Sequence, residues 1–287
     1  MTLFVCLGMG YSARVLGRRL RHAGTAVHGT SRTAGGVARL AAEGFAASVM
    51  TGGVASAETV AAIGMASHIL VSPAPESQGD PVLRAHAADL ATSPANWIGY
   101  LSTVGVYGDH GGAWVDEGAE LRATSPRAVR RVAADRAWRA LGRRAGKAVH
   151  IFRLAGIYGP GRGAIDNLRD GTARRIDTPG QVFNRIHVAD LATILEASMA
   201  RPRAGAIYNV ADLQPAPPQD VVAHAAGLLG VAVPPLIPFA DAPMTEMARS
   251  FYADCKRVSS ARVVAELGVT FAFPTYREGL AAIMKVS

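Results

Sequence analysis

A short apolar run that ends in a glycine-rich turn near the start of the chain constrains the fold most. Leu3–Leu7 is uninterrupted apolar sequence, and Gly8-Met9-Gly10-Tyr11-Ser12-Ala13 follows it directly. An apolar run of this length predicts a strand that is buried on both faces, as in a parallel sheet. After the turn, Val15, Leu16 and Leu20 recur at helical spacing. The chain therefore opens with a strand, a glycine turn and a helix.

The residue types in the turn indicate what it can bind. Glycine at positions 8 and 10 lets the chain turn tightly and lets its backbone approach a pyrophosphate, and the small Ala13 lets the helix pack closely on the strand. Phosphate would bind the free N–H groups at the N-terminus of the helix, helped by the helix dipole, and Tyr11, Ser12 and Ala13 in the turn are candidates to line this site. The alternative is an ordinary strand-to-helix turn that happens to carry glycines. Its place between a strand and a helix favours a dinucleotide-binding site.

The end of the second predicted strand indicates which dinucleotide is preferred. The strand covers Ala26–Thr30, and Ser31 and Arg32 follow it. Sites that prefer NAD usually carry an Asp or Glu here, which binds the ribose hydroxyls. A hydroxyl and a guanidinium instead suit the additional 2′-phosphate of NADP. Arg32 could also be an ordinary solvated arginine, but its position favours a preference for NADP(H) over NAD(H).

Strand and helix patterns alternate through the rest of the chain. Further strands are predicted around 45–50 and 206–212, and 67–75, 96–108 and 148–162 are each predicted to be a strand that runs into a loop; helices are predicted at 38–44, 127–144, 190–199 and 219–229. This alternation predicts an α/β fold with a doubly wound parallel sheet of the Rossmann type. Prolines punctuate the last third, which predicts a small, mostly helical C-terminal lobe over the carboxyl edge of the sheet. The expected domains are a Rossmann domain at 1–165 and a mainly substrate-binding lobe at 166–287, with about 183–212 returning to pack on the first.

Composition excludes several protein classes. Hydrophobic residues make up 49% of the 287 residues, which excludes a disordered chain. The two cysteines, Cys6 and Cys255, form no CxxC motif or Cys/His cluster. We therefore expect no metal site and two buried thiols in a reducing cytoplasm. No apolar run is long enough to span a bilayer, and the start has no secretory leader.

The net charge of +8 raises the question of a nucleic-acid partner. It comes from 27 Arg and three Lys against 22 acidic residues. The helix predicted at 127–144 is the best support for such a partner, because it contains seven arginines. These spread around the helix, and the chain has no recognised DNA- or RNA-binding motif. The sequence therefore argues against nucleic acid and favours a small-molecule substrate.

Several segments together resemble the short-chain dehydrogenase/reductase superfamily in its extended form, which includes NAD(P)-dependent epimerases and dehydratases. Besides the glycine turn, the segments are LSTVGVYG, WVDE, RLAGIYGPG, RIHVADLA, YNVAD and the closing KRVSSARVVAELG and PTYREGL. In this order they cover nearly the whole chain. The resemblance implies a Rossmann domain, an NAD(P) cofactor and often a nucleotide-sugar or related substrate. It also implies a homodimer formed through a helix bundle.

One mismatch separates this chain from typical members. They carry Tyr-x-x-x-Lys at the start of the helix after the VYG loop, whereas the matching positions here are Arg127 and Arg131. Arginine stays protonated, so Arg127 cannot take the proton-transfer role of the tyrosine. Arg131 can still bind ribose or phosphate. The chain thus resembles atypical subgroups that keep the cofactor fold and lack the catalytic pair.

The resemblance also assigns roles to other residues. It places Thr103 where a hydroxyl binds the substrate carbonyl, with Ser102 as the neighbouring substitute. Tyr107 is a candidate proton donor or a pocket-lining residue. Residues implied to lie along the cofactor are Ser72, Pro73 and Tyr158.

Two functions follow from these assignments. The first is an NADP(H)-dependent oxidoreductase, or an enzyme of the epimerase/dehydratase kind, acting on a small polar, sugar-like substrate. Its proton would come from Tyr107, His110 or water, and Arg127 could stabilise an oxyanion. The second is a non-catalytic sensor or regulator that binds NADP(H). The missing tyrosine and lysine favour the sensor, and the retained pocket segments favour the enzyme.

Overall fold

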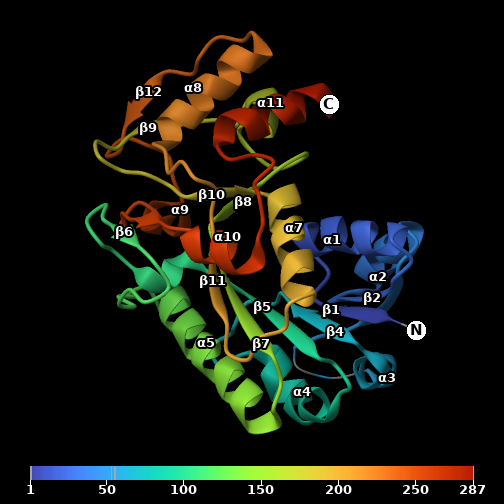
Figure 1. Ribbon diagram of the computed structural model, residues 1–287. Coiled ribbons are helices and arrows are strands. Elements are labelled where there is room, and N and C mark those ends of the chain that lie inside the picture. Colours follow the sequence, from blue (N-terminus) through green and yellow to red (C-terminus); the bar gives the residue numbers. More distant parts are fainter. Residues whose placement is uncertain (1, 53, 55, 287) are drawn as a thin grey trace. The chain divides into compact units, whose positions relative to one another are not determined.

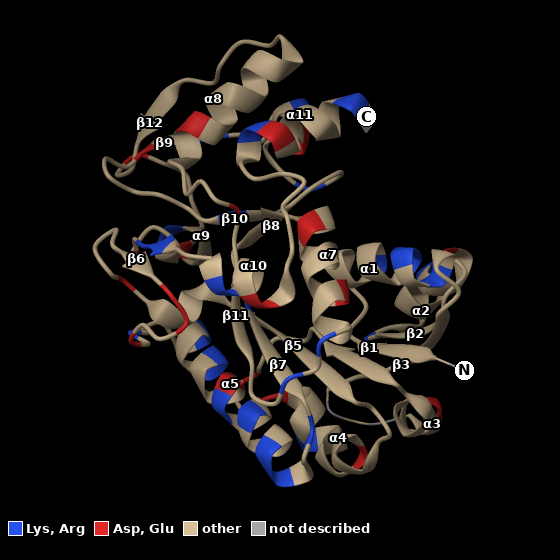
Figure 2. Cartoon of the chain, viewed as in Figure 1, with Lys and Arg blue, Asp and Glu red and all other residues tan. Residues whose placement is uncertain are grey.

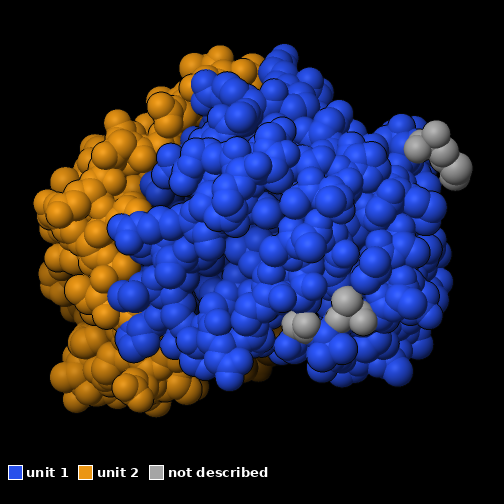
Figure 3. All heavy atoms as spheres, turned by 90° about the horizontal axis from the view of Figure 1, so that it is seen from below, with its two compact units in different colours: residues 1–106, 126–153, 192–208 blue, residues 107–125, 154–191, 209–287 orange. Residues whose placement is uncertain are grey.

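The computed structural model describes residues 2–52, 54 and 56–286 and divides into two compact units (Figure 3). The first unit contains residues 1–106, 126–153 and 192–208, and the second contains 107–125, 154–191 and 209–287. The sequence suggested a boundary after residue 165 and a return at about 183–212. The structure instead groups 107–125 and 154–165 with the second unit. The later segment that belongs to the first unit is 192–208.

A seven-stranded sheet forms the centre of the fold (Figure 1). Its strand order is β11-β7-β5-β4-β1-β2-β3, and the pairs β1–β2, β1–β4, β2–β3 and β4–β5 are parallel. The strands are β1 (Leu3–Leu7), β2 (Ala26–Ser31), β3 (Ala46–Val49), β4 (His68–Val71), β5 (Trp97–Thr103), β7 (Val149–Leu154) and β11 (Ile207–Val210). The order reverses at β1, because the chain first adds strands on one side and then on the other. The predicted Rossmann-type α/β fold is confirmed.

Helices connect these strands. They are α1 (Tyr11–His22), α2 (Ala34–Ala42), α3 (Ala57–Met65), α4 (Pro81–Thr92), α5 (Pro126–Ala145) and α7 (Val188–Met199). Sequence patterning missed α3 and α4, both of which have caps. Ser56 Oγ accepts the N–H of Thr59 at the start of α3. Asp80 accepts two N–H groups at the start of α4, where Pro81 is the first residue.

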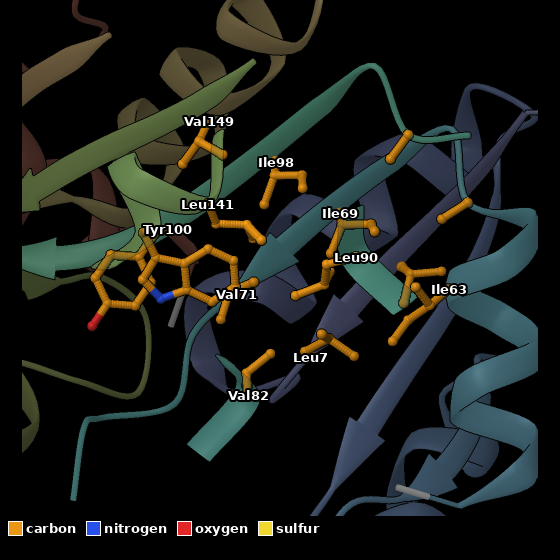
Figure 4. Packing of buried hydrophobic residues seen from close by; sticks show 14 of the residues in the cluster. Leu7, Ile63, Ile69, Val71, Val82, Leu90, Ile98, Tyr100, Leu141 and Val149 are labelled. Carbon is orange, nitrogen blue, oxygen red and sulfur yellow. The ribbon is translucent and has the colours of Figure 1, made fainter. Parts of the chain in front are cut away.

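Both faces of the sheet are buried in the first unit. On one face, apolar side chains such as Ile69 and Ile98 pack with Ile63, Leu90 and Leu141 from α3, α4 and α5 (Figure 4). The strands therefore lack a solvent-facing side, which explains their continuous apolar runs.

The other face carries a buried polar network. Trp97 Nε1 donates to Ser198 Oγ over 3.0 Å, and His150 Nδ1 lies 2.6 Å from the same oxygen. The backbone N–H of Arg203 donates to His150 Nε2 over 2.8 Å. Since Nε2 accepts, the neutral imidazole carries its proton on Nδ1. Burial lowers the pKa of His150 to about 4.

The second unit combines helices with short parallel strand pairs. The pairs are β8 (Gly156–Tyr158) with β10 (Arg185–His187), β9 (Arg175–Asp177) with β12 (Leu236–Pro238), and β6 (Trp114–Val115) with β13 (Arg257–Val258). The helices are α6 (Ala164–Arg169), α8 (Pro218–Leu229), α9 (Glu246–Ser250), α10 (Ala261–Leu267) and α11 (Tyr276–Val286). A core that includes Ile165, Val221 and Leu280 joins α6, α8 and α11.

The two thiols differ in exposure. Cys6 is fully buried in β1, whereas Cys255 is partly exposed. The expectation of two buried thiols is therefore wrong for Cys255. It lies on a loop whose backbone carbonyl accepts N–H groups from His110 and Gly112, which leaves its side chain near the surface. No helix among the described residues is long and apolar enough to cross a membrane.

Candidate functional site

The glycine turn of the first unit is built around Gly8. Its φ of +84° lies in the left-handed region, which other residues rarely adopt. A Cβ at this position would come 2.9 Å from Pro73 Cδ. The N–H of Gly8 donates to Thr30 Oγ1 over 2.8 Å. Conformation and space therefore both require glycine, and the turn is fixed by β2 and by the loop after β4.

The start of α1 is open. Gly10 precedes the helix, is exposed, and has no atom within 4 Å of the place where a Cβ would lie. Among the described residues, no side chain caps this helix, and its first turn, which includes Tyr11 and Ser12, contains no acid. Ala13 is buried, so α1 packs closely on the sheet. A phosphate group can approach such a helix end without displacing a side chain.

The loop after β4 lies beside this turn. Ser72 N donates to Leu7 O over 3.0 Å, and Pro73 is the residue in contact with Gly8. Ser72 and Pro73 are both half-buried. The structure thus brings together candidate cofactor-binding residues from the loops that follow β1 and β4.

Arg32 follows β2 directly and is exposed. Its carbonyl accepts a hydrogen bond from Thr51 Oγ1, while its guanidinium has no hydrogen bond or ion pair with any described residue. Ser31 is half-buried, and Thr33 caps α2 by accepting the N–H of Gly36 over 3.1 Å. No carboxylate follows β2 before α2 begins. An anion here would meet a guanidinium and no like charge from this segment.

The two hydroxyls at the end of β5 have different partners. Thr103 Oγ1 is half-buried and accepts the N–H of Gly105 over 3.1 Å, so its own proton remains to be donated. Ser102 is buried and donates to Asp135 Oδ1 over 2.5 Å. Arg153 Nε donates to the other oxygen of Asp135 over 3.3 Å. Burial raises the pKa of Asp135, and the bonds from Ser102 and Arg153 oppose this. The Ser102 hydroxyl is therefore engaged in a buried hydrogen bond, whereas Thr103 is half-buried.

The two arginines that replace the catalytic pair lie in different surroundings. Arg127 is exposed in the first turn of α5. Arg131 is half-buried, and its Nη1 donates to Tyr100 OH over 2.9 Å and to Leu101 O over 2.8 Å. Burial raises the pKa of Tyr100. The structure thus places Arg131 against the end of β5.

Tyr107, in the second unit, is fully buried. Its hydroxyl donates to Asn209 Oδ1 over 2.7 Å, and Asn209 N donates to Glu117 Oε1 over 2.7 Å. These bonds connect the Tyr107 hydroxyl to Asn209, and Asn209 to Glu117, within the second unit. His110 is more accessible, and its Nε2 lies 3.2 Å from Glu120 O.

Tyr158 is also buried in the second unit, on the face that β8 shares with β10. Its ring meets His187 edge to face at 5.2 Å, and its hydroxyl lies 3.4 Å from Thr275 O. Burial raises the pKa of Tyr158 and lowers that of His187 to about 4. His187 Nε2 is buried with no hydrogen-bond partner among the described residues.

Asp212 is a residue that sequence reasoning missed. It is 2% exposed, and its Oδ2 has no hydrogen-bond partner in the described part of the chain. Burial raises its pKa to about 7, although the hydrogen bond from Gln214 N to its Oδ1 and the charge of Arg185 oppose this. Arg185 Nη1 itself donates to the carbonyls of Phe183 and Ala216. The signal was present in the sequence, because an acid follows the apolar strand in YNVAD.

Comparisons with known proteins agree with this architecture. A family model described as the NAD dependent epimerase/dehydratase family matches residues 86–211. A protein of unknown function from Silicibacter pomeroyi is 46% identical, with a TM-score of 0.91 over 100% of this chain and 99% of that one. No curated protein matches the sequence.

More distant solved structures share the fold. A dTDP-glucose 4,6-dehydratase from Bacillus anthracis in complex with NAD is 15% identical, with a TM-score of 0.78 over 99% of this chain and 96% of that one. A UDP-glucuronic acid 4-epimerase from Bacillus cereus in complex with NAD is 13% identical, with the same TM-score and coverage. At these identities the likeness concerns the fold alone.

Proposed function

Because a model of the NAD-dependent epimerase/dehydratase family matches residues 86–211, we propose that the first unit of this chain binds a nicotinamide dinucleotide and prefers NADP(H) to NAD(H). The observation that carries the preference is Arg32, an exposed guanidinium directly after β2 in a segment without a carboxylate. The dehydratase and epimerase described above are in complex with NAD, so the preference rests on this chain's own residues. Gly8, Gly10 and the open start of α1 would accommodate the pyrophosphate.

The proposed activity is oxidation or reduction of a carbonyl or carbinol carbon in a small polar, sugar-like substrate. A nicotinamide, when bound, would supply or accept the hydride. Thr103 has a hydroxyl proton to donate to the substrate oxygen, because its Oγ1 accepts from Gly105. Arg131 would add positive charge at the same end of β5. Since Ser102 and Tyr107 are engaged elsewhere, water is the proton source that fits these contacts.

A non-catalytic NADP(H) sensor is the second candidate. The observation that favours it is the engagement of the polar groups that could replace the missing tyrosine. Tyr107 donates to Asn209, and Arg127 cannot transfer a proton. A sensor would still need the glycine turn and Arg32, so cofactor binding alone does not separate the two functions.

The test combines a titration with a turnover assay. NADPH and NADH are titrated by their fluorescence into the wild type, Arg32→Ala and the control Arg39→Ala, which changes an exposed arginine in α2. NADPH should bind about tenfold more tightly than NADH, and only Arg32→Ala should remove the difference. Equal binding of both cofactors to the wild type would contradict the preference.

The turnover assay follows NADPH consumption with a panel of sugars and aldehydes. The enzyme hypothesis predicts turnover by the wild type and a loss of at least about 100-fold in Thr103→Val. Tight NADPH binding without turnover on any member of the panel would favour the sensor.

A further inference from the structure

The guanidinium of Arg131 is held at one end only. Its Nη1 makes two hydrogen bonds, to the hydroxyl of Tyr100 and to the carbonyl of Leu101. An Nη group carries two N–H donors, so these bonds use both of them. The guanidinium also lies over the Tyr100 ring at 5.6 Å. The Arg131 side chain, which extends from α5, is therefore held against β5 by these contacts.

The opposite edge of the same guanidinium is unused. Nε–H and the two N–H groups of Nη2 have no hydrogen-bond partner among the described residues, and neither nitrogen belongs to the buried unpartnered polar atoms. Nε–H and one Nη2 N–H point in parallel from one edge of the plane. This edge matches two oxygens of a carboxylate or phosphate, which accept side by side.

The nearby carboxylates bond to other groups. Asp135, one helical turn after Arg131, accepts from Arg153 and Ser102. Asp80, whose charge also acts on Tyr100, accepts from Trp138 Nε1 and from the N–H groups at the start of α4. No salt bridge joins Arg131 to any acid in the described part of the chain. Its free edge thus lacks an internal anion.

Tyr100 is suited to hold this arrangement. Its side chain is fully buried and stacks on Trp138 with ring centroids 5.4 Å apart. A ring fixed in this way sets the place of its hydroxyl, and the hydroxyl sets the direction of the guanidinium. Thr103, at the end of the same strand, contributes a second hydrogen-bond donor. The side chain between Leu101 and Thr103 is Ser102, whose hydroxyl already donates to Asp135.

We propose that Arg131 binds an oxyanion with two acceptor oxygens through its Nε and Nη2 edge, and that Tyr100 is its positioning residue. Two sources have this chemistry, a carboxylate on the substrate and a phosphate of the cofactor. The inference deepens the proposed function, and it rests on that function for the identity of the cofactor. With a substrate carboxylate as the source, the chain would act on hydroxy or keto acids.

The experiment measures anion binding by isothermal titration calorimetry. NADPH, oxalate and inorganic phosphate are each titrated into the free protein, and the last two also into the NADPH-saturated protein. The variants are Arg131→Gln, Arg131→Lys, Tyr100→Phe and, as a control, Arg136→Gln. Arg136 is exposed in the same helix, where Figure 2 shows arginines along the whole length of α5. Circular dichroism melting of every variant monitors the fold.

Arg131→Gln should weaken at least one of the three probes about tenfold or more, and Arg136→Gln should change each less than about twofold. Arg131→Lys should restore only part of the affinity, because an ammonium lacks the two-donor edge. Tyr100→Phe should weaken the same probe about threefold at an unchanged melting temperature. It should have no further effect in the Arg131→Gln background, since a positioning residue acts only through the residue it holds.

The arms separate the outcomes. Loss of NADPH affinity in Arg131→Gln identifies a cofactor phosphate, and loss of oxalate affinity alone identifies a substrate carboxylate; both support the inference. Unchanged binding of all three probes in Arg131→Gln overturns it while leaving NADPH binding, and hence the proposed function, intact. Oxalate or phosphate binding that depends on Arg131 in a protein that does not bind NADPH supports the inference and overturns the proposed function. A wild type that binds none of the probes overturns both.

Discussion

The two units differ in the hydrogen bonds that their buried carboxylates accept. In the first unit, Asp135 has a partner on each oxygen, from Ser102 and Arg153. In the second unit, Asp212 is equally buried and has an oxygen without a hydrogen-bond partner among the described residues. Removing one partner of a buried ion pair is costly because it leaves an uncompensated charge, and a buried oxygen without a hydrogen bond costs free energy in the native protein itself. The polar groups around Asp135 therefore satisfy one another, whereas Asp212 Oδ2 has no partner in the described part of the chain.

The largest expected effect is on the paired carboxylate. Asp135→Ala leaves the Arg153 guanidinium buried without its acid, and it should lower the free energy of unfolding by about 3–5 kcal/mol. Urea denaturation followed by circular dichroism measures this. Ser102→Ala is the matched control, because it removes one hydrogen bond and should cost only about 1 kcal/mol. A loss below about 1 kcal/mol in Asp135→Ala would show that the pairing does not carry the stability assigned to it.

The next effect concerns the buried imidazole of the first unit. The pKa of His150 is lowered to about 4, while an unfolded histidine titrates near 6.5. The contribution of neutral His150 is thus fully present above about pH 6.5. It is lost as the pH falls toward 4, because the unfolded chain then binds a proton that the folded chain excludes. The total loss is about 3 kcal/mol.

Urea denaturation between pH 4.5 and 7.5 measures this loss. His150→Gln should flatten the acid side of the stability profile by about one proton. His187→Gln is the matched comparison, since its pKa is lowered to a similar value without a partner for Nε2. If both variants keep the wild-type slope, neither histidine is buried neutral in solution.

Asp212 should change the stability in the opposite direction, so that stability falls as the pH rises. Its pKa is raised to about 7 in the fold, so the unfolded chain releases the proton first as the pH rises. Stability is therefore greatest below about pH 4 and is lost between about pH 4 and 7. Asp212→Asn removes this ionisation and should stabilise the protein at pH 8 by about 2 kcal/mol. Destabilisation of Asp212→Asn at pH 8, measured by urea denaturation, would mean that the Asp212 carboxylate stabilises the fold as Asp135 does. The two units would then not differ in this respect.

The sequence predicted the fold well where apolar runs and glycine turns alternate. The strands at Leu3–Leu7 and Ala26–Ser31 and the helix at Pro218–Leu229 lie close to their predicted bounds. The helices α3 and α4 were missed because they are rich in alanine and short of large apolar residues, so their periodicity is weak. Their capping residues, Ser56 and Asp80, were the signal that could have found them.

Sequence reasoning found positions in the site more readily than contacts. It located Thr103 at the end of β5 and Arg131 on α5, because strand ends and helical spacing can be read from one segment. It could not separate Ser102 from Thr103, since the partner of Ser102 is 33 residues away on another element. The partner of Arg131, Tyr100, was missed for the same reason. Such pairings depend on tertiary packing, which no local pattern contains.

The smallest expected change in stability comes from alanine substitutions at the two glycines of the turn, which should differ in their cost. Gly8→Ala forces a Cβ against Pro73 at a positive φ and should lower the free energy of unfolding by about 1–3 kcal/mol. Gly10→Ala adds a methyl group in open space at a φ of −87°, and it should cost less than about 1 kcal/mol. Under the proposed function the same methyl group lies in the path of the pyrophosphate, so NADPH affinity should fall about tenfold in Gly10→Ala. Chemical denaturation and fluorescence titration of the two variants measure both quantities. Unchanged NADPH affinity in Gly10→Ala would mean that the phosphates do not bind in the open space at the start of α1. The cofactor site would then have to be sought in another part of the protein.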